Sequence, residues 1–262
     1  MTALSRPSPT VTAKSRAREL LALPHMRLHL ILAALCCLTF WIGSIYISEC
    51  TLLAVVPWEP LYESRYVLYV LFDVLYYTVD VLIIVLIGLP LLYGAAMIFE
   101  GAARGNREPM ATLFCAFDSH RRYGRTLGLM LRLLGAHALP VGLCVWLIWA
   151  RYRTAGPSSL WETVPMTLLF LGAVSIILAR NDAVLALAYD DHSATVRELF
   201  ARSRAMTRGR WLALWKFKLS YIGWAALSVL SLGLIFIFHA LPHFSLSYSL
   251  LLTAEAGDHT QS

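Results

Sequence analysis

The sequence has few charged residues. Of its 262 residues only 15% are charged, whereas 58% are hydrophobic, and the mean hydropathy is +0.64. An ordinary soluble domain has about a quarter of its residues charged. This shortage of charge argues against a soluble globular protein. Several apolar runs are long enough to cross a hydrocarbon core of about 30 Å, which indicates an integral membrane protein.

The sequence also lacks the motifs on which most enzymes depend. It has no glycine-rich phosphate loop, no nucleophile elbow, and no Ser, His and Asp set at a suitable spacing. Its five cysteines form no CxxC pair. The histidine pairs His25/His29 and His239/His243 have no glutamate in the arrangement of a zinc hydrolase. We therefore predict a protein that is not an enzyme, with no catalytic residue, no cofactor and no metal site.

The long apolar runs predict an all-α bundle of transmembrane helices. The runs are Met26–Ser48, Val67–Phe99, Leu127–Ala150, Leu160–Ala179 and Trp211–Thr253. The last run is too long for one span, because a single helix without charge from Lys218 to Glu255 would reach about 50 Å. A break at Gly233 divides it into Trp211–Leu232 and Leu234–Thr253, which gives six spans. The alternative is five spans, with the last one ending near Pro242.

Basic residues predict which side of the membrane each loop occupies. They are concentrated before the first span, between the second and third spans, and between the fourth and fifth spans. The positive-inside rule therefore places the N-terminus in the cytoplasm. The formal net charge of +6 follows from these loops, and no segment outside the spans is large enough to form a nucleic-acid-binding domain. We predict no nucleic-acid partner.

The three basic segments resemble one another, which indicates an internal repeat. Arg18-Glu19-Leu20-Leu21 precedes the first span, Tyr123-Gly124-Arg125-Thr126-Leu127 opens the third, and Arg197-Glu198-Leu199-Phe200 precedes the fifth. Each repeat would consist of a short interfacial amphipathic helix, an outward span and an inward span. We predict a disordered tail over residues 1–11, one transmembrane domain of three such repeats over 12–253, and a C-terminal tail over 254–262.

The third interfacial helix has the clearest pattern. It is predicted to begin at Ser193 as its N-cap, with Val196, Leu199, Phe200 and Ser203 on one face. Its arginines lie largely elsewhere and are predicted to contact lipid headgroups; they are Arg197, Arg202, Arg204 and Arg208. We expect anionic lipids as partners of this face, and a solvated charged helix is the alternative.

A stripe of polar residues follows the second span. Steps of three and four residues place them on one face of a helix; they are Tyr69, Asp73, Tyr76, Tyr77 and Asp80. A carboxylate deep in hydrocarbon costs about 2.5–3.5 kcal/mol on insertion scales, so Asp80 must face the bundle, be protonated or have a partner. The stripe indicates either a hydrated or proton-responsive pathway or a polar network that holds helices together.

Both ends of the chain resemble the DUF975 family of bacterial integral membrane proteins, whose function is not established. The residues concerned are Lys14-Ser15-Arg16-Ala17-Arg18-Glu19-Leu20-Leu21, then Ser203, Met206 and Gly209, and then Leu219-Ser220-Tyr221-Ile222-Gly223-Trp224. The last string is the most specific part. The resemblance implies a multispanning protein of the bacterial plasma (inner) membrane and implies no chemistry.

Two functions remain open at this point. The first is a non-enzymatic scaffold or accessory subunit of a bacterial envelope or export system, which has a membrane-protein partner or assembles with itself. The second is a transporter of a small solute or ion that uses the Tyr and Asp stripe.

Overall fold

The structure is a computed structural model that describes residues 9–55, 66–156, 160–224, 227, 231 and 236–259. The regular elements in these ranges are all helices, which confirms the predicted all-α class. They are α1 (Pro9–Ala22), α2 (Pro24–Val55), α4 (Tyr66–Ile83), the π-helix η1 (Ile84–Gly88), α5 (Leu89–Ala103), the 3-10 helix η2 (Met110–Asp118), α6 (His120–Ala155), α7 (Leu160–Leu178), the 3-10 turn η4 (Ala179–Asn181), α8 (Val184–Asp190), α9 (Val196–Met206), α10 (Trp211–Leu219), the π-helix η5 (Phe236–Ala240) and α12 (Leu241–His259).

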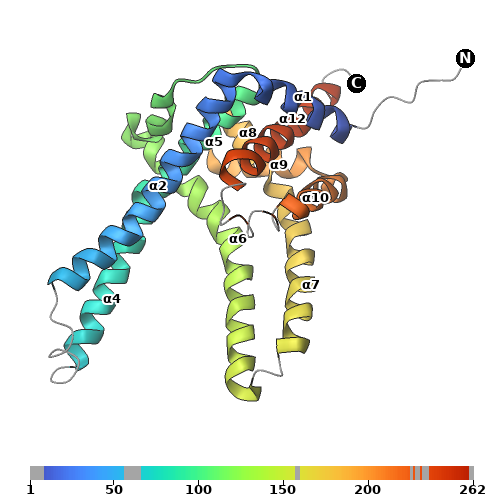
Figure 1. The fold of residues 1–262 in the computed structure, drawn as a ribbon. Helices are drawn as coiled ribbons and strands as arrows, with labels where there is room; N and C mark the ends of the chain where they lie inside the picture. Colours follow the sequence, from blue (N-terminus) through green and yellow to red (C-terminus); the bar gives the residue numbers. More distant parts are fainter. Residues whose placement is uncertain are drawn as a thin grey trace, which may run out of the picture.

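Two helical hairpins extend away from one end of the molecule. Helices α2 and α4 lie side by side in one hairpin, and α6 and α7 form the other (Figure 1). Large apolar side chains on α6 and α7 are exposed, with Leu139 at 74% and Leu169 at 71% of their full accessible area. Exposed apolar surface of this extent is unfavourable in water, whereas hydrocarbon accommodates it.

Three helical segments among the described residues are long and apolar enough to cross a membrane. They are Val74–Ala103, His120–Thr154 and Trp161–Asp190. Helix α1 and the first part of α2 bend by 96° at the break between them, and together they would make a fourth candidate span. The described part of the chain is therefore all-helical, with three or four candidate spans.

The last apolar run differs from the prediction. Helix α10 ends at Leu219, where the chain turns and the Ser220 hydroxyl donates a hydrogen bond to the carbonyl of Phe217, and residues 222–224 are again helical. Among the described residues, neither α10 nor α12 is a candidate span, so the predicted six spans are not confirmed. The predicted break at Gly233 lies outside the described residues.

The helices at the two ends of the chain extend into segments that were predicted as tails. Helix α1 begins at Pro9, within the predicted N-terminal tail over residues 1–11, and residues 1–8 lie outside the described part. Helix α12 continues to His259, within the predicted tail over 254–262. Helices α1 and α12 lie against each other.

Three helices, α5, α8 and α12, meet at the end from which the hairpins extend, and we call them the returning helices. Helix α5 packs against both α8 and α12 there (Figure 1). Another helix lies against each of them: η2 against α5, α9 against α8, and α1 against α12. We call η2, α9 and α1 the leading helices. The buried residues of this end include Ala17, Ile98, Leu199 and Leu246.

Two of the returning helices begin in the same way. The π-helix η1 is followed by Leu89 and Pro90, and the π-helix η5 is followed by Leu241 and Pro242. Proline has no backbone N–H, so Pro90 cannot donate to the carbonyl of Leu86 four residues before it. The hydroxyl of Tyr123 on α6 donates to that carbonyl instead, at 2.9 Å. This hydrogen bond links α6 to the second span.

A close backbone contact fixes η2 on α5. A Cβ atom at Gly94 would lie 2.2 Å from the carbonyl oxygen of Leu113, so only glycine allows this approach. Leu113 and Ala116 of η2 are buried as a result.

Candidate functional site

A buried carboxylate joins the three returning helices. Glu100 on α5 forms an ion pair with Arg104 at 2.7 Å and accepts a hydrogen bond from the Ser249 hydroxyl of α12 at 2.7 Å. Arg104 also pairs with Asp190 of α8 at 2.9 Å. We call Glu100, Arg104, Asp190 and Ser249 the ion-pair junction. Because the Glu100 side chain is only 9% exposed, the Arg104 charge is needed to keep the carboxylate in the interior.

The guanidinium of Arg104 also contacts an aromatic ring. It lies over the ring of Tyr189 at 4.6 Å from the centroid, and Tyr189 donates a hydrogen bond to Glu108 at 2.6 Å. These contacts connect α8 to the loop that precedes η2.

A second ion pair lies between η4 and the last two helices. Lys218 of α10 pairs with Asp182 at 2.6 Å, and the Tyr248 hydroxyl of α12 donates to the same carboxylate. The Asp182 carboxylate thus joins α10 to α12.

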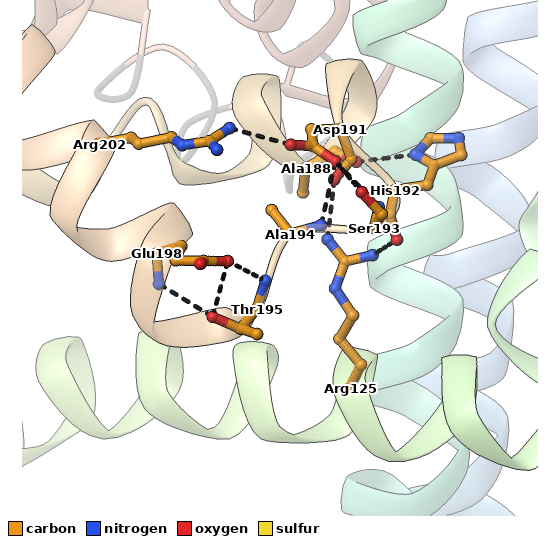
Figure 2. Close-up of polar contacts among 9 residues, drawn as sticks. All are labelled: Arg125, Ala188, Asp191, His192, Ser193, Ala194, Thr195, Glu198 and Arg202. Carbon is orange, nitrogen blue, oxygen red and sulfur yellow. Dashed lines mark hydrogen bonds and ion pairs between the residues drawn. The ribbon is translucent and has the colours of Figure 1, made fainter.

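The loop between α8 and α9 is organised by one carboxylate. Asp191 accepts hydrogen bonds from the Ser193 hydroxyl and from the backbone N–H groups of Ser193 and Ala194, at 2.7–3.0 Å, and pairs with Arg202 at 2.9 Å (Figure 2). The Ser193 hydroxyl first, and then Arg202, lower the pKa of Asp191 to about 2. Asp191 is therefore ionised at every physiological pH and holds α9 in place.

Helix α6 supports the same loop from its opposite side. Arg125 donates hydrogen bonds to the backbone carbonyls of Asp191, at 2.9 Å, and of His192 (Figure 2). Its Nε atom is buried and has no hydrogen-bond partner within the described residues. Arg125, which belongs to the basic segment at the start of α6, thus fixes the loop that leads into α9.

Helix α9 begins two residues later than predicted. Its N-cap is Thr195, which forms a capping box with Glu198, while Ser193 belongs to the Asp191 loop. The prediction that Ser193 caps the helix is wrong: the Thr195 hydroxyl accepts the capping hydrogen bond from the Glu198 backbone N–H, and the Ser193 hydroxyl donates to Asp191. Donation from the Thr195 backbone N–H and hydroxyl lowers the pKa of Glu198. Leu199, Phe200 and Ser203 of α9 are buried.

The four arginines predicted on α9 have different surroundings. All four are exposed, but Arg202 is neutralised by Asp191. Arg204 and Arg208 lie together with Arg180 of η4, a residue that was not predicted for this site. These three arginines, with Thr207 and Gly209, line a pocket of about 280 Å³, which we call the arginine pocket. Arg197 is not among its lining residues.

The arginine pocket is held by hydrogen bonds between η4 and the end of α9. The backbone carbonyl of Arg180 accepts hydrogen bonds from the Ser203 hydroxyl at 2.9 Å and from the Thr207 hydroxyl at 3.2 Å. Gly209 has φ of 81°, which lets the chain turn from α9 to α10 beside the pocket. The sequence shows Arg180 only as an arginine that directly follows the fourth apolar run. Its hydrogen-bond partners Ser203 and Thr207 lie 23 and 27 residues further along the chain, so the sequence did not indicate the pocket.

The predicted polar stripe lies on α4, and only part of it is described. Asp80 and Tyr76 are half-buried and Tyr77 is exposed. The rings of Tyr76 and Tyr77 meet edge to face, with centroids 5.1 Å apart. The side chains of Tyr69 and Asp73 lie outside the described residues, so the stripe stays a prediction. Asp80 lies within the candidate span Val74–Ala103.

Three of the histidines in the two sequence pairs contact other groups of the protein. His29 makes a hydrogen bond with the backbone carbonyl of Glu108, and His243 makes one with the Tyr221 hydroxyl. His239 and His243 stack with ring centroids 6.0 Å apart. No group of three or more His, Cys, Asp or Glu residues that could hold a metal ion occurs in the described part of the chain.

Comparison with known proteins gives no relative for this chain. No family model, no curated protein and no solved structure matches it. The resemblance to the DUF975 family therefore depends on the residues quoted above alone.

Proposed function

We propose that this protein is a non-enzymatic membrane scaffold or accessory subunit of a bacterial envelope or export system. The observation behind this proposal is the contrast between the two parts of the molecule. At one end, described ionisable groups such as Glu100, Arg104 and Asp182 are used in pairs that join helices. Away from that end, α6 and α7 expose long apolar faces that can contact lipid or another membrane protein.

The proposed topology has six spans in the plasma (inner) membrane, with both termini in the cytoplasm. Two structural features support it. Helices α1 and α12 pack against each other, as expected if both ends of the chain are on the same side. The matching starts of α5 and α12, each a π-helix followed by Leu-Pro, support an internal repeat. The positive-inside rule supplies the orientation.

In this topology α9 lies at the cytoplasmic headgroups as an interfacial helix. Its buried face, which includes Leu199 and Phe200, packs on the protein, and its exposed arginines are directed to anionic lipid. Each arginine near the surface contributes roughly 1 kcal/mol to this attraction, which salt screens.

Site-specific photocrosslinking in native membranes tests the scaffold proposal. A photoreactive residue at Leu139 or Leu169, which are exposed on α6 and α7, should form a discrete adduct with another membrane protein or a second copy. The matched control is Leu129 on α6, which is only 1% exposed and should give no such adduct. Lipid adducts alone at both exposed positions would contradict a scaffold role.

The second candidate function is transport of a small solute or ion along the Tyr and Asp stripe. The observation in its favour is that Asp80 is a half-buried carboxylate within a candidate span. Asp80→Asn should then abolish pH-dependent flux in reconstituted vesicles while the protein keeps its abundance. The exposed Asp118 supplies the control variant Asp118→Asn, which should leave flux unchanged. Absence of any flux in the wild type would contradict the transport function.

A further inference from the structure

The arginine pocket concentrates positive charge in a small volume. Three arginines, Arg180, Arg204 and Arg208, line a pocket of about 280 Å³, and no acidic residue is among its lining residues. This volume corresponds to several water molecules at about 30 Å³ each, which is enough for a small headgroup. The pocket is therefore suited in size and in charge to a compact anion.

Other arginines of this chain are neutralised within the protein. Arg104, Arg122 and Arg202 each form an ion pair with a carboxylate at 2.5–2.9 Å. In the described part of the chain, by contrast, the three pocket arginines form no ion pair, although Arg204 donates a hydrogen bond to the Phe200 carbonyl at 3.1 Å. Three like charges close together repel one another, and an anion bound between them removes that repulsion.

The pocket walls are fixed before any ligand arrives. Ser203 and Thr207 are buried, with exposures of 0% and 2%, and both donate to the Arg180 carbonyl. The end of α9 and η4 therefore hold the backbones of the three arginines at a set separation. Arginine binds phosphate oxygens through paired N–H donors in a planar group, which a lysine ammonium does not reproduce.

We propose that the arginine pocket is a binding site for a phosphate monoester. A monoester has a charge of about −1.5 to −2 near neutral pH, so it matches three guanidinium groups better than a phosphodiester with a single charge. The phosphate group belongs either to a lipid headgroup, as in phosphatidic acid, or to a soluble compound such as glycerol 3-phosphate. The lipid source rests on the proposed interfacial position of α9, whereas the soluble source does not.

Binding is measured on the full-length protein in nanodiscs of neutral lipid. One series adds phosphatidic acid or phosphatidylglycerol, adjusted to equal surface charge, and another adds soluble glycerol 3-phosphate. The variants are Arg208→Gln and Arg180→Gln, with Arg208→Lys to keep the charge. Arg197→Gln is the matched control, because Arg197 is an exposed arginine on α9 that lies outside the pocket. Thermal unfolding of each variant verifies that it is folded.

A pocket site should prefer phosphatidic acid to phosphatidylglycerol. Arg208→Gln and Arg180→Gln should each weaken monoester binding about 10-fold or more, Arg208→Lys should weaken it less, and Arg197→Gln should leave it within about 2-fold. Tight binding of glycerol 3-phosphate with the same variant pattern would support the site and identify the ligand as soluble. Equal binding of both lipids, with equal losses in Arg197→Gln and Arg208→Gln, would overturn the proposal in favour of diffuse attraction.

The result is separable from the photocrosslinking test of the scaffold function. Selective phosphate binding without partner adducts would support the pocket proposal and contradict the scaffold role. Partner adducts without selective phosphate binding would support the scaffold role and contradict the pocket proposal.

Discussion

Replacement of Glu100 by glutamine tests whether the ion-pair junction holds the returning helices together. Glutamine has nearly the same shape, so the variant removes the charge without opening a cavity. It leaves Arg104 paired with Asp190 alone, and its amide can still accept the hydrogen bond from the Ser249 hydroxyl. Removal of one partner of a buried ion pair costs about 3–5 kcal/mol when nothing compensates. Because Asp190 compensates in part, we expect a loss of roughly 2–3 kcal/mol in the free energy of unfolding.

Thermal unfolding in detergent micelles measures this loss. A change of 1 kcal/mol shifts the midpoint by about 2–4 °C for a chain of this size, so Glu100→Gln should unfold about 4–12 °C below the wild type. The control is Asp118→Asn, which breaks the ion pair with Arg122. The side chains of that pair are 59% and 42% exposed, so its loss should cost about 0–1 kcal/mol.

The order of the two variants decides the question. If Glu100→Gln unfolds no lower than Asp118→Asn, the buried junction does not stabilise the meeting of α5, α8 and α12, and the reasoning from its burial is refuted.

Three further perturbations address other contacts. The pKa of Asp191 is lowered from 3.8 to about 2, so the contribution of this carboxylate to stability is complete above about pH 4 and is lost as the pH falls through 2. The difference in unfolding midpoint between the wild type and Asp191→Asn should therefore disappear over that pH range. Tyr123→Phe should cost about 0.5–1.5 kcal/mol in the free energy of unfolding, because it removes the hydroxyl that donates to the Leu86 carbonyl, whereas Tyr152→Phe on the exposed end of α6 should cost almost nothing. Gly94→Ala should lower expression and the unfolding midpoint strongly, whereas Gly128→Ala, which has open space around its Cβ position, should leave both unchanged or raised.

The sequence predicted well those features that local patterns determine. The second apolar run, Val67–Phe99, corresponds to the continuous helical segment from Tyr66 to Ala103, and Leu127–Ala150 lies within α6. Hydrophobic periodicity and length are properties of a short window, so they can be read without knowledge of the fold. The buried face of α9, with Leu199 and Phe200, follows the same logic.

Features that depend on distant partners were not predictable in this way. Glu100 could be seen as an acidic residue at the end of an apolar run with Arg104 four residues later, but Ser249 lies 149 residues away. The partner of Asp182 likewise belongs to a different helix, α10. The Thr195 cap was a different kind of error, because Glu198 three residues later was a visible capping-box signal and Ser193 was chosen instead.

The location of the C-terminus tests the central claim most directly, namely that three repeats make six spans with both termini on the cytoplasmic side. A single cysteine at Ser262, in a background without the native cysteines, is treated with a membrane-impermeant thiol reagent in intact cells and after permeabilisation. The six-span account predicts labelling only after permeabilisation. Labelling of Ser262→Cys in intact cells would mean an odd number of spans and would contradict the three-fold repeat.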